Sequence, residues 1–311
     1  MSDVLSVAAV AVGDADRRPA LMSPEQATSH VSDGMTVGIG GFINSGHPMT
    51  LVRQLIRDGR RDLTVVGAAS AGLEIDLLIA AGCVQKVISP YIGAEGLVGI
   101  GPAYRHAAQA GTIEIAETDE ALYYAGLRAA AQCLPFNPWS AGLGTSIPMV
   151  NPSITEFDDP ITGRRMLAVP AINIDICFLH AAVSDPYGNV QHHGTSYGDT
   201  ALAAAADMVI ASVESVVAVE TVRANPAATT IPGADGVVRA PFGAHPFSSD
   251  GYYVPDRTHI DEYLHAASEL LRSNTRASID AYLDRYVLGA ADDVEYLERV
   301  GLRRLLSLHE F

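Results

Sequence analysis

The segment Val37-Gly38-Ile39-Gly40-Gly41-Phe42 constrains the fold more than any other, because it is a short apolar run that ends on paired glycines. A strand ending on glycine exposes backbone without a Cβ, so a ligand can approach the chain closely there. In an open α/β sheet, ligands bind at the carboxyl edge of the strands. We therefore expect a first strand over residues 35–40, followed directly by a loop that contributes to a binding site.

Helix and strand signals alternate through the first part of the chain. Ser23 followed by Pro24 predicts a helix that runs to about Val31, since both residues are favoured at a helix start. Further strands are predicted at residues 63–66, 84–89 and 113–115, and further helices at residues 48–57, 75–81, 104–110 and 121–133. This alternation predicts the α/β class, with a doubly wound, largely parallel sheet flanked by helices.

The middle of the chain breaks this rhythm, because residues 134–163 are rich in proline and glycine. A segment of this kind inside a compact domain is usually a functional cover or a small subdomain. After it, we expect strands at residues 167–169, 174–179, 208–211 and 215–219, and a helical region from Glu262 to the end. The expected organisation is a disordered tail at residues 1–20 and a single domain at residues 21–311, with a loop-rich insertion at about residues 134–165.

The composition excludes several classes of partner. The formal net charge is −16, from 36 acidic and 20 basic residues, so binding to nucleic acid or to an anionic membrane is disfavoured. The first residues lack the basic and apolar regions of a signal peptide, and no apolar run reaches membrane-spanning length. We expect a cytoplasmic protein with no membrane or nucleic-acid partner.

The cysteines and histidines do not form a metal-binding pattern. Cys83, Cys133 and Cys177 are widely spaced in apolar surroundings, and we expect all three to be buried, reduced thiols. His192 and His193 are adjacent, which on a strand directs them to opposite faces. We expect no metal site.

Several segments, in this order and over nearly the whole chain after the tail, resemble the A (α) subunit of family I coenzyme A transferases, nearest the glutaconate CoA-transferase type. The similar segments are residues 34–42, 62–67, 76–79, 134–136, 169–171, 185–190, 240–246 and 295–297, together with Asp175 and His180. No single segment identifies the family, but the ordered set of segments is hard to obtain by chance.

The resemblance implies a reaction and a partner. Family I enzymes move CoA between carboxylic acids through a glutamyl-CoA thioester, and the nucleophilic glutamate normally lies in the B (β) subunit. The Glu-Asn-Gly-type motif that contains this glutamate does not occur in this sequence. The resemblance therefore implies a chain that is active only with a B subunit, as αβ or (αβ)₂, with coenzyme A as a substrate and no permanently bound cofactor.

The same comparison suggests the site residues. The backbone amides near Gly40 and Gly41 are expected to stabilise the oxyanion of the tetrahedral intermediates. The expected substrate-binding residues are Phe42, Ala69, Ser70, Glu95, Gly243 and His245. His245 lies between Ala244 and Pro246, so the alternative is a structural histidine that fixes its loop.

Glu120 keeps a second enzymatic alternative open. It opens a predicted helix, where a carboxylate is also favoured by the helix dipole. By resemblance, the transferases have glutamine at the position of Glu120. A glutamate at this position is similar instead to the A subunit of a ring-opening acyl-CoA hydrolase of steroid degradation, which has the same fold. In that branch Glu120 would act as a general acid or base. A non-catalytic acyl-CoA-binding subunit is the third alternative, and a sugar-phosphate isomerase a distant fourth.

Overall fold

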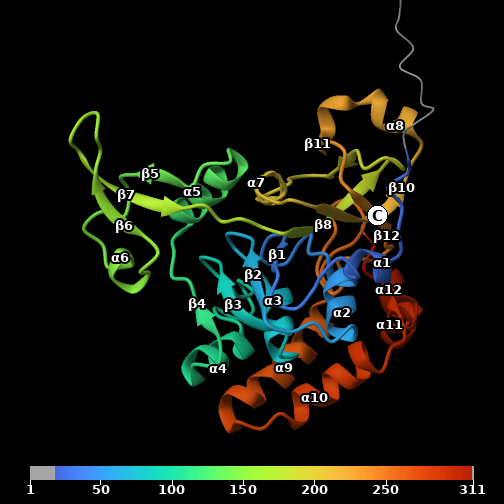
Figure 1. The fold of residues 1–311 in the computed structure, drawn as a ribbon. Coiled ribbons are helices and arrows are strands. Elements are labelled where there is room, and N and C mark those ends of the chain that lie inside the picture. Colours follow the sequence, from blue (N-terminus) through green and yellow to red (C-terminus); the bar gives the residue numbers. More distant parts are fainter. Residues whose placement is uncertain (1–17, 310–311) are drawn as a thin grey trace, which may run out of the picture.

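The computed structural model describes residues 18–309, whose centre is a nine-stranded sheet (Figure 1). The strands run parallel in the order β12-β10-β8-β1-β2-β3-β4. The short strand β9 pairs antiparallel with the end of β8, and β11 pairs antiparallel with β9. Their bounds are β1 (Thr36–Ile39), β2 (Leu63–Gly67), β3 (Val84–Ile88), β4 (Glu114–Ile115), β8 (Ile176–Ser184), β9 (Val190–Gln191), β10 (Val209–Val216), β11 (Thr229–Ile231) and β12 (Gly236–Arg239). The predicted fold class is confirmed.

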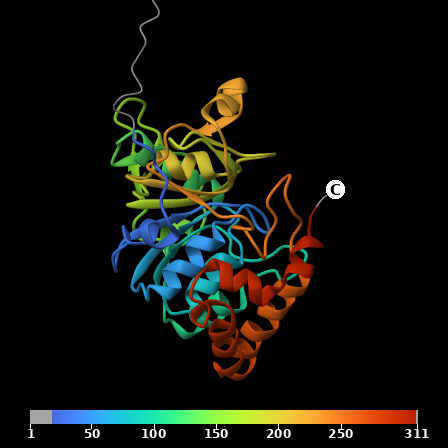
Figure 2. The ribbon, with the colours of Figure 1, turned by 90° about the vertical axis from the view of Figure 1, so that its right-hand side faces the viewer.

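Helices cover both faces of the sheet (Figures 1 and 2). One layer contains α2 (Met49–Arg57), α3 (Leu73–Ala80), α4 (Pro102–Ala110), α9 (Arg257–Ser273) and α10 (Ala277–Leu283). The other contains α5 (Glu120–Ala131) and α7 (Asp199–Ala204). Shorter helices around the main sheet are α1 (Pro24–Thr28), α8 (Val219–Ala224), η2 (Pro226–Ala228), η3 (Asp284–Leu288), α11 (Asp293–Val300) and α12 (Leu302–Leu306). The two faces have separate apolar clusters, so each layer has its own core.

The predicted start of the first helix is confirmed in atomic detail. The Ser23 hydroxyl accepts a hydrogen bond from the Gln26 amide, while the Gln26 side chain accepts one from the Ser23 amide. This reciprocal pair satisfies two amides that a helix start leaves without partners. Residues 1–17, most of the predicted tail, lie outside the described residues.

The two strands predicted at residues 208–211 and 215–219 form one strand, β10. The prediction of a break was wrong because the intervening polar residues are bonded within the sheet. Ser212 and Glu214 both contact the ring of His180 on β8, at 2.9 Å each. Buried polar side chains that satisfy each other need no loop to reach water.

Residues 134–170 leave the main sheet and form a three-stranded antiparallel sheet of β5 (Phe136–Trp139), β6 (Thr155–Asp158) and β7 (Arg165–Pro170), with α6 (Ile147–Val150). It projects to one side in Figure 1. The predicted strand at residues 167–169 therefore lies in this small sheet. Leu167 and Val169 pack against Leu122 of α5, while the hairpin residue Ile161 is 90% exposed.

The C-terminal helices are joined to the first helices by a buried arginine. Arg53 on α2 is 1% exposed, and its guanidinium donates to both carboxylate oxygens of Asp293 at the start of α11, at 2.6 and 2.8 Å. It also donates to the carbonyl of His245 and lies 3.7 Å above the Tyr296 ring. The helical region begins at Arg257, capped by Asp256, rather than at Glu262.

The cysteine prediction is wrong at one position. Cys83 and Cys177 are buried free thiols, but Cys133 is exposed. It follows the end of α5 with a positive φ of 54°, so the chain turns there before the small sheet and directs this side chain outward. Among the described residues, no helix is both long and apolar enough to cross a membrane.

Asp293→Ala should lower the free energy of unfolding by about 3–5 kcal/mol, because it leaves a buried guanidinium without its counter-ion. Urea unfolding measures the change. The matched control is Asp261→Ala, which removes an exposed pair with Arg257 and should cost about 0.5 kcal/mol or less. Equal effects of the two substitutions would contradict the role given to the buried pair.

Candidate functional site

Three loops at the carboxyl edge of the parallel sheet are bonded to one another. In the β1–α2 loop (residues 40–48), the Ile43 amide donates to the Ser70 carbonyl of the β2–α3 loop at 2.8 Å. The Asn44 side chain donates to the Glu95 carbonyl of the β3–α4 loop at 3.3 Å. The structure thus brings Gly40, Gly41, Phe42, Ala69, Ser70 and Glu95 to one edge.

The amides of Gly40 and Gly41 both have partners. Gly40 donates to the Phe178 carbonyl of β8 at 2.9 Å, and Gly41 donates to Oδ1 of Asp199 at 2.9 Å. Both amides are therefore engaged in this conformation. Their hydrogen bonds fix the path of the β1–α2 loop.

The need for glycine at these two positions follows from close approach. A Cβ on Gly40 would lie 2.5 Å from the Asp199 carboxylate, and one on Gly41 would lie 2.3 Å from the His47 ring. Gly41 also has a φ of +105°, a backbone conformation that side chains rarely adopt. The paired glycines allow Asp199 and His47 to hold the loop from two sides.

Phe42 presents an aromatic surface at this edge. Its ring stacks on Tyr197 with centroids 4.6 Å apart and an interplanar angle of 4°. Tyr197 is 37% exposed, so the pair is partly open to solvent. A small pocket of about 20 Å³ beside it, room for one water, is lined by polar residues that include Ser45, His192 and Asp250.

Glu120 is the first residue of α5 and is exposed. The preceding Asp119 caps the helix by accepting from the Leu122 amide, so Glu120 is not needed for that. Within residues 18–309, its carboxylate has no hydrogen bond or ion pair. Burial raises the pKa of Tyr124, and the nearby carboxylates of Glu120 and Asp199 raise it further. Glu120 follows the loop after β4, which places it at the carboxyl edge of the sheet.

Gly243 and His245 lie in the loop that follows β12, and both are buried. The Gly243 carbonyl accepts from the Thr50 amide of α2 at 3.0 Å. His245 is fully buried, and its ring nitrogens contact the Tyr296 hydroxyl at 2.6 Å and the Asp256 carboxylate at 3.0 Å. Burial lowers the pKa of His245, which favours its neutral form. In this structure it supports the loop and does not face solvent.

The cluster around His245 contains a second buried histidine. His259 is fully buried, and its Nε2 lies 2.9 Å from the Tyr282 hydroxyl, while Nδ1 has no partner among the described residues. Burial lowers the pKa of His259 well below its usual value, and the neighbouring His245 lowers it further. A neutral ring is thus required for this packing.

Sequence reasoning missed the residues that hold the β1–α2 loop. Asp199 accepts from Gly41 and from Nε2 of His192, whose other ring nitrogen contacts Thr230. His193 instead stacks on Tyr252, so the two adjacent histidines do have different surroundings. In the sequence, Asp199 is recognisable only as an acidic residue at the start of a helix. Nothing near it in the sequence predicts its contact with Gly41.

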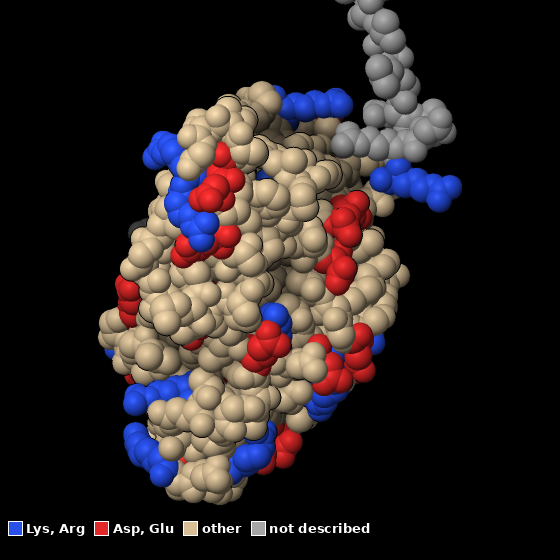
Figure 3. Space-filling view, turned by 60° about the vertical axis from the view of Figure 1, so that its left-hand side comes forward, with Lys and Arg blue, Asp and Glu red and all other residues tan. Residues whose placement is uncertain are grey.

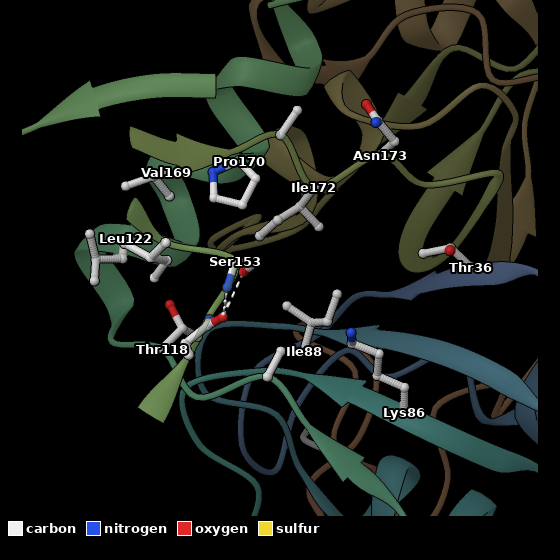
Figure 4. A pocket seen from close by; sticks show the side chains of 14 residues that line it. Thr36, Lys86, Ile88, Thr118, Leu122, Ser153, Val169, Pro170, Ile172 and Asn173 are labelled. Carbon is white, nitrogen blue, oxygen red and sulfur yellow. Dashed lines mark hydrogen bonds between the residues drawn. The ribbon is translucent and has the colours of Figure 1, made fainter. Parts of the chain in front are cut away.

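A larger pocket of about 370 Å³ lies between β3 and the base of the small sheet. Figure 4 shows Lys86 and Ile88 pointing from β3 toward Pro170 and Ile172. Lys86, the only lysine in the sequence, is paired with Glu114 at 2.5 Å. Figure 3 shows the hollowed face on this side, with charged groups of both signs around it. None of the site residues predicted from the sequence lines this pocket.

A family model of coenzyme A transferases matches residues 21–238, and the chain belongs to this family. The structure is similar to the crystal structure of glutaconate coenzyme A-transferase from Acidaminococcus fermentans, with a TM-score of 0.86 and 28% identity over 94% of this chain and 96% of that chain. The A subunit of that enzyme is 29% identical over 90% of this chain and 91% of its own length. The resemblance to this A subunit is confirmed.

Two further relatives differ from each other in length and in what their names say. The cholesterol ring-cleaving hydrolase IpdA subunit of Mycobacterium tuberculosis is 32% identical over 90% of this chain and 96% of its own length. An uncharacterized protein of Archaeoglobus fulgidus is 35% identical over 93% of this chain, but this chain spans only 65% of that protein. Within residues 18–309, no group of three or more histidine, cysteine, aspartate or glutamate side chains is placed to hold a metal ion.

Wild-type stability should fall as the pH decreases from about 7 to about 5. In the unfolded chain His259 takes up a proton with a pKa near 6.5, whereas in the folded chain burial keeps its ring neutral, so protonation favours the unfolded state. His259→Phe, which keeps an aromatic ring in the cluster, should flatten this dependence by up to about 1.4 kcal/mol per pH unit. The measurement is urea unfolding across this range. Parallel curves for wild type and variant would contradict the requirement for a neutral ring.

Proposed function

We propose that this chain is the A subunit of a CoA-transferase that moves CoA between an acyl-CoA and a carboxylic acid. The glutamyl-CoA thioester forms on a partner B subunit, so the chain is active only in an αβ or (αβ)₂ assembly. Coenzyme A is a substrate, and no cofactor is permanently bound. The proposed setting is cytoplasmic, with no membrane or nucleic-acid partner.

The observation that carries this proposal is the joined carboxyl edge of the sheet. Hydrogen bonds from Ile43 and Asn44 connect loops that follow three adjacent parallel strands. Phe42 directly precedes these two residues in the same loop, and its stack with Tyr197 is the proposed packing surface for the acyl group. The similarity to a transferase A subunit over 90% of the chain supports the same assignment.

In the proposed reaction, splitting thioester exchange into two acyl transfers on a glutamate lowers each barrier. This chain supplies shape and binding surface, with Ala69, Ser70 and Phe42 against the substrate. The candidate oxyanion donors are the amides of residues 69 and 70, for which the described residues offer no hydrogen-bond acceptor. Gly40, Gly41, Gly243 and His245 hold the surrounding loops.

Trapping of the thioester tests the mechanism. The chain is co-expressed with the B subunit, incubated with an acyl-CoA and treated with hydroxylamine or borohydride before mass spectrometry. A modified glutamate on the B subunit is expected. CoA binding without an adduct and without turnover would favour the non-catalytic alternative.

Glu120 supports a second candidate function, a ring-opening acyl-CoA hydrolase. Its exposed carboxylate is unpaired among the described residues and starts α5 at the carboxyl edge of the sheet, where a general acid or base could reach a bound substrate. The relative named as a cholesterol ring-cleaving hydrolase subunit is 32% identical to this chain. In this alternative, the A subunit itself contributes the catalytic acid.

Glu120→Gln separates the two functions. Under the transferase proposal, kcat should stay within about threefold of wild type, since the glutamate nucleophile lies elsewhere. Under the hydrolase alternative, kcat with a cyclic ketone thioester should fall about 10²–10⁴-fold, the usual contribution of general acid–base catalysis. The control is Glu117→Gln in the loop that precedes α5, an exposed carboxylate whose loss should leave either activity unchanged.

A further inference from the structure

The loops at the carboxyl edge of the parallel strands contain no lysine or arginine. These loops are residues 40–48, 68–72, 89–101, 116–119, 185–189 and 240–253. Histidine is therefore the only side chain in them that can carry a positive charge near neutral pH. His47 in the β1–α2 loop is fully buried directly beneath the candidate site.

The contacts of His47 define its protonation state. Its Nδ1 lies 3.0 Å from the Gly40 carbonyl oxygen, and its Nε2 lies 3.2 Å from the Ile43 carbonyl oxygen. Carbonyl oxygens only accept hydrogen bonds, so each ring nitrogen must donate. A neutral imidazole carries one N–H, whereas this arrangement requires two. Both contacts are therefore those expected of an imidazolium.

Glu74 on α3 is the counter-ion. Its carboxylate is fully buried, with Oε1 accepting from the Gly72 amide at 2.9 Å and Oε2 lying 3.3 Å from Nδ1 of His47. Burial raises the pKa of Glu74, and His47 opposes that rise. A neutral pair with the proton on Glu74 is disfavoured, because the lone pair of Nδ1 would then face the Gly40 oxygen at 3.0 Å.

The His47 ring fits between two loops because each loop has a glycine where a Cβ would clash with it. A Cβ on Gly41 would lie 2.3 Å from Nδ1, and a Cβ on Gly72 would lie 2.7 Å from Nε2. The edge of the ring meets Phe247, with centroids 4.8 Å apart. His47 is thus wedged between the β1–α2 and β2–α3 loops, which both border the candidate site.

We propose that His47, held as an imidazolium by Glu74, is the positioning residue that fixes the β1–α2 loop for acyl transfer. By donating to Gly40 and Ile43 on either side of Phe42, it sets the backbone on which the aromatic surface stands. The effect on turnover rests on the proposed function. The protonation state is independent of it and can be measured on the isolated chain.

The first experiment is NMR of histidine ring nitrogens in the isolated chain, with His47 assigned by substitution. At about pH 8, above the ordinary histidine pKa of about 6.5, both His47 nitrogens should carry protons. In Glu74→Gln the ring should lose one proton at the same pH. A wild-type His47 with only one protonated nitrogen would overturn the proposal, whatever the enzyme does.

The second experiment measures turnover of the assembled enzyme. Glu74→Gln should lower kcat and kcat/KM together by about tenfold or more, because a misplaced loop weakens transition-state contacts. Other titratable groups close to the pair include Asp76 on α3 and Tyr263 on α9, and Asp199 accepts from the Gly41 amide on the other side of the loop.

The matched control is Asp76→Asn, which removes another fully buried carboxylate from α3. Asp76 accepts from Tyr263 and Tyr104 and does not contact the β1–α2 loop, so turnover should persist although stability changes. If Glu74→Gln leaves kcat unchanged, the positioning role is overturned. If the wild-type assembly exchanges no thioester, the proposed function fails while the NMR result still stands.

Discussion

The buried guanidinium of Arg53 is the interaction on which the arrangement of the whole chain depends. It sits at 1% exposure and satisfies its donors with a carboxylate more than two hundred residues away and with a backbone carbonyl of the loop after β12. A buried charge of this kind tolerates few alternative arrangements, because every lost partner leaves an uncompensated ion. It therefore fixes α11, the Gly243–His245 segment and α2 relative to one another.

That fixed frame determines how the candidate site is built. The β1–α2 loop leaves the sheet at Gly40 and ends where α2 begins, so its far end is anchored by the same helix that carries Arg53. Its near end is held by Asp199 on one side and by His47 on the other. The exposed surface of the site thus rests on a layer of buried polar groups, each satisfied by a specific partner.

The sequence predicted the parts of this architecture that depend on local patterns. Apolar runs, caps and paired glycines are short-range signals, and the parallel sheet, the first helix cap and the loop after β1 were identified from them. The contacts that hold the site were not, because the Gly41–Asp199 bond joins residues 158 positions apart. Glu214 and Ser212 look like strand breakers until His180 is placed opposite them. Cys133 sits in an apolar stretch, yet a left-handed turn directs it to solvent.

The small sheet has a property that follows from where it begins and ends. Phe136 on its first strand pairs with Pro170 on its last, and the Ala171 amide donates to the Pro135 carbonyl at 3.1 Å, so entry and exit are neighbours. A segment whose two ends meet can be lengthened, shortened or exchanged without moving the strands that precede and follow it. The small sheet can therefore change in length or sequence during evolution while the strands of the main sheet and their carboxyl edge keep their positions.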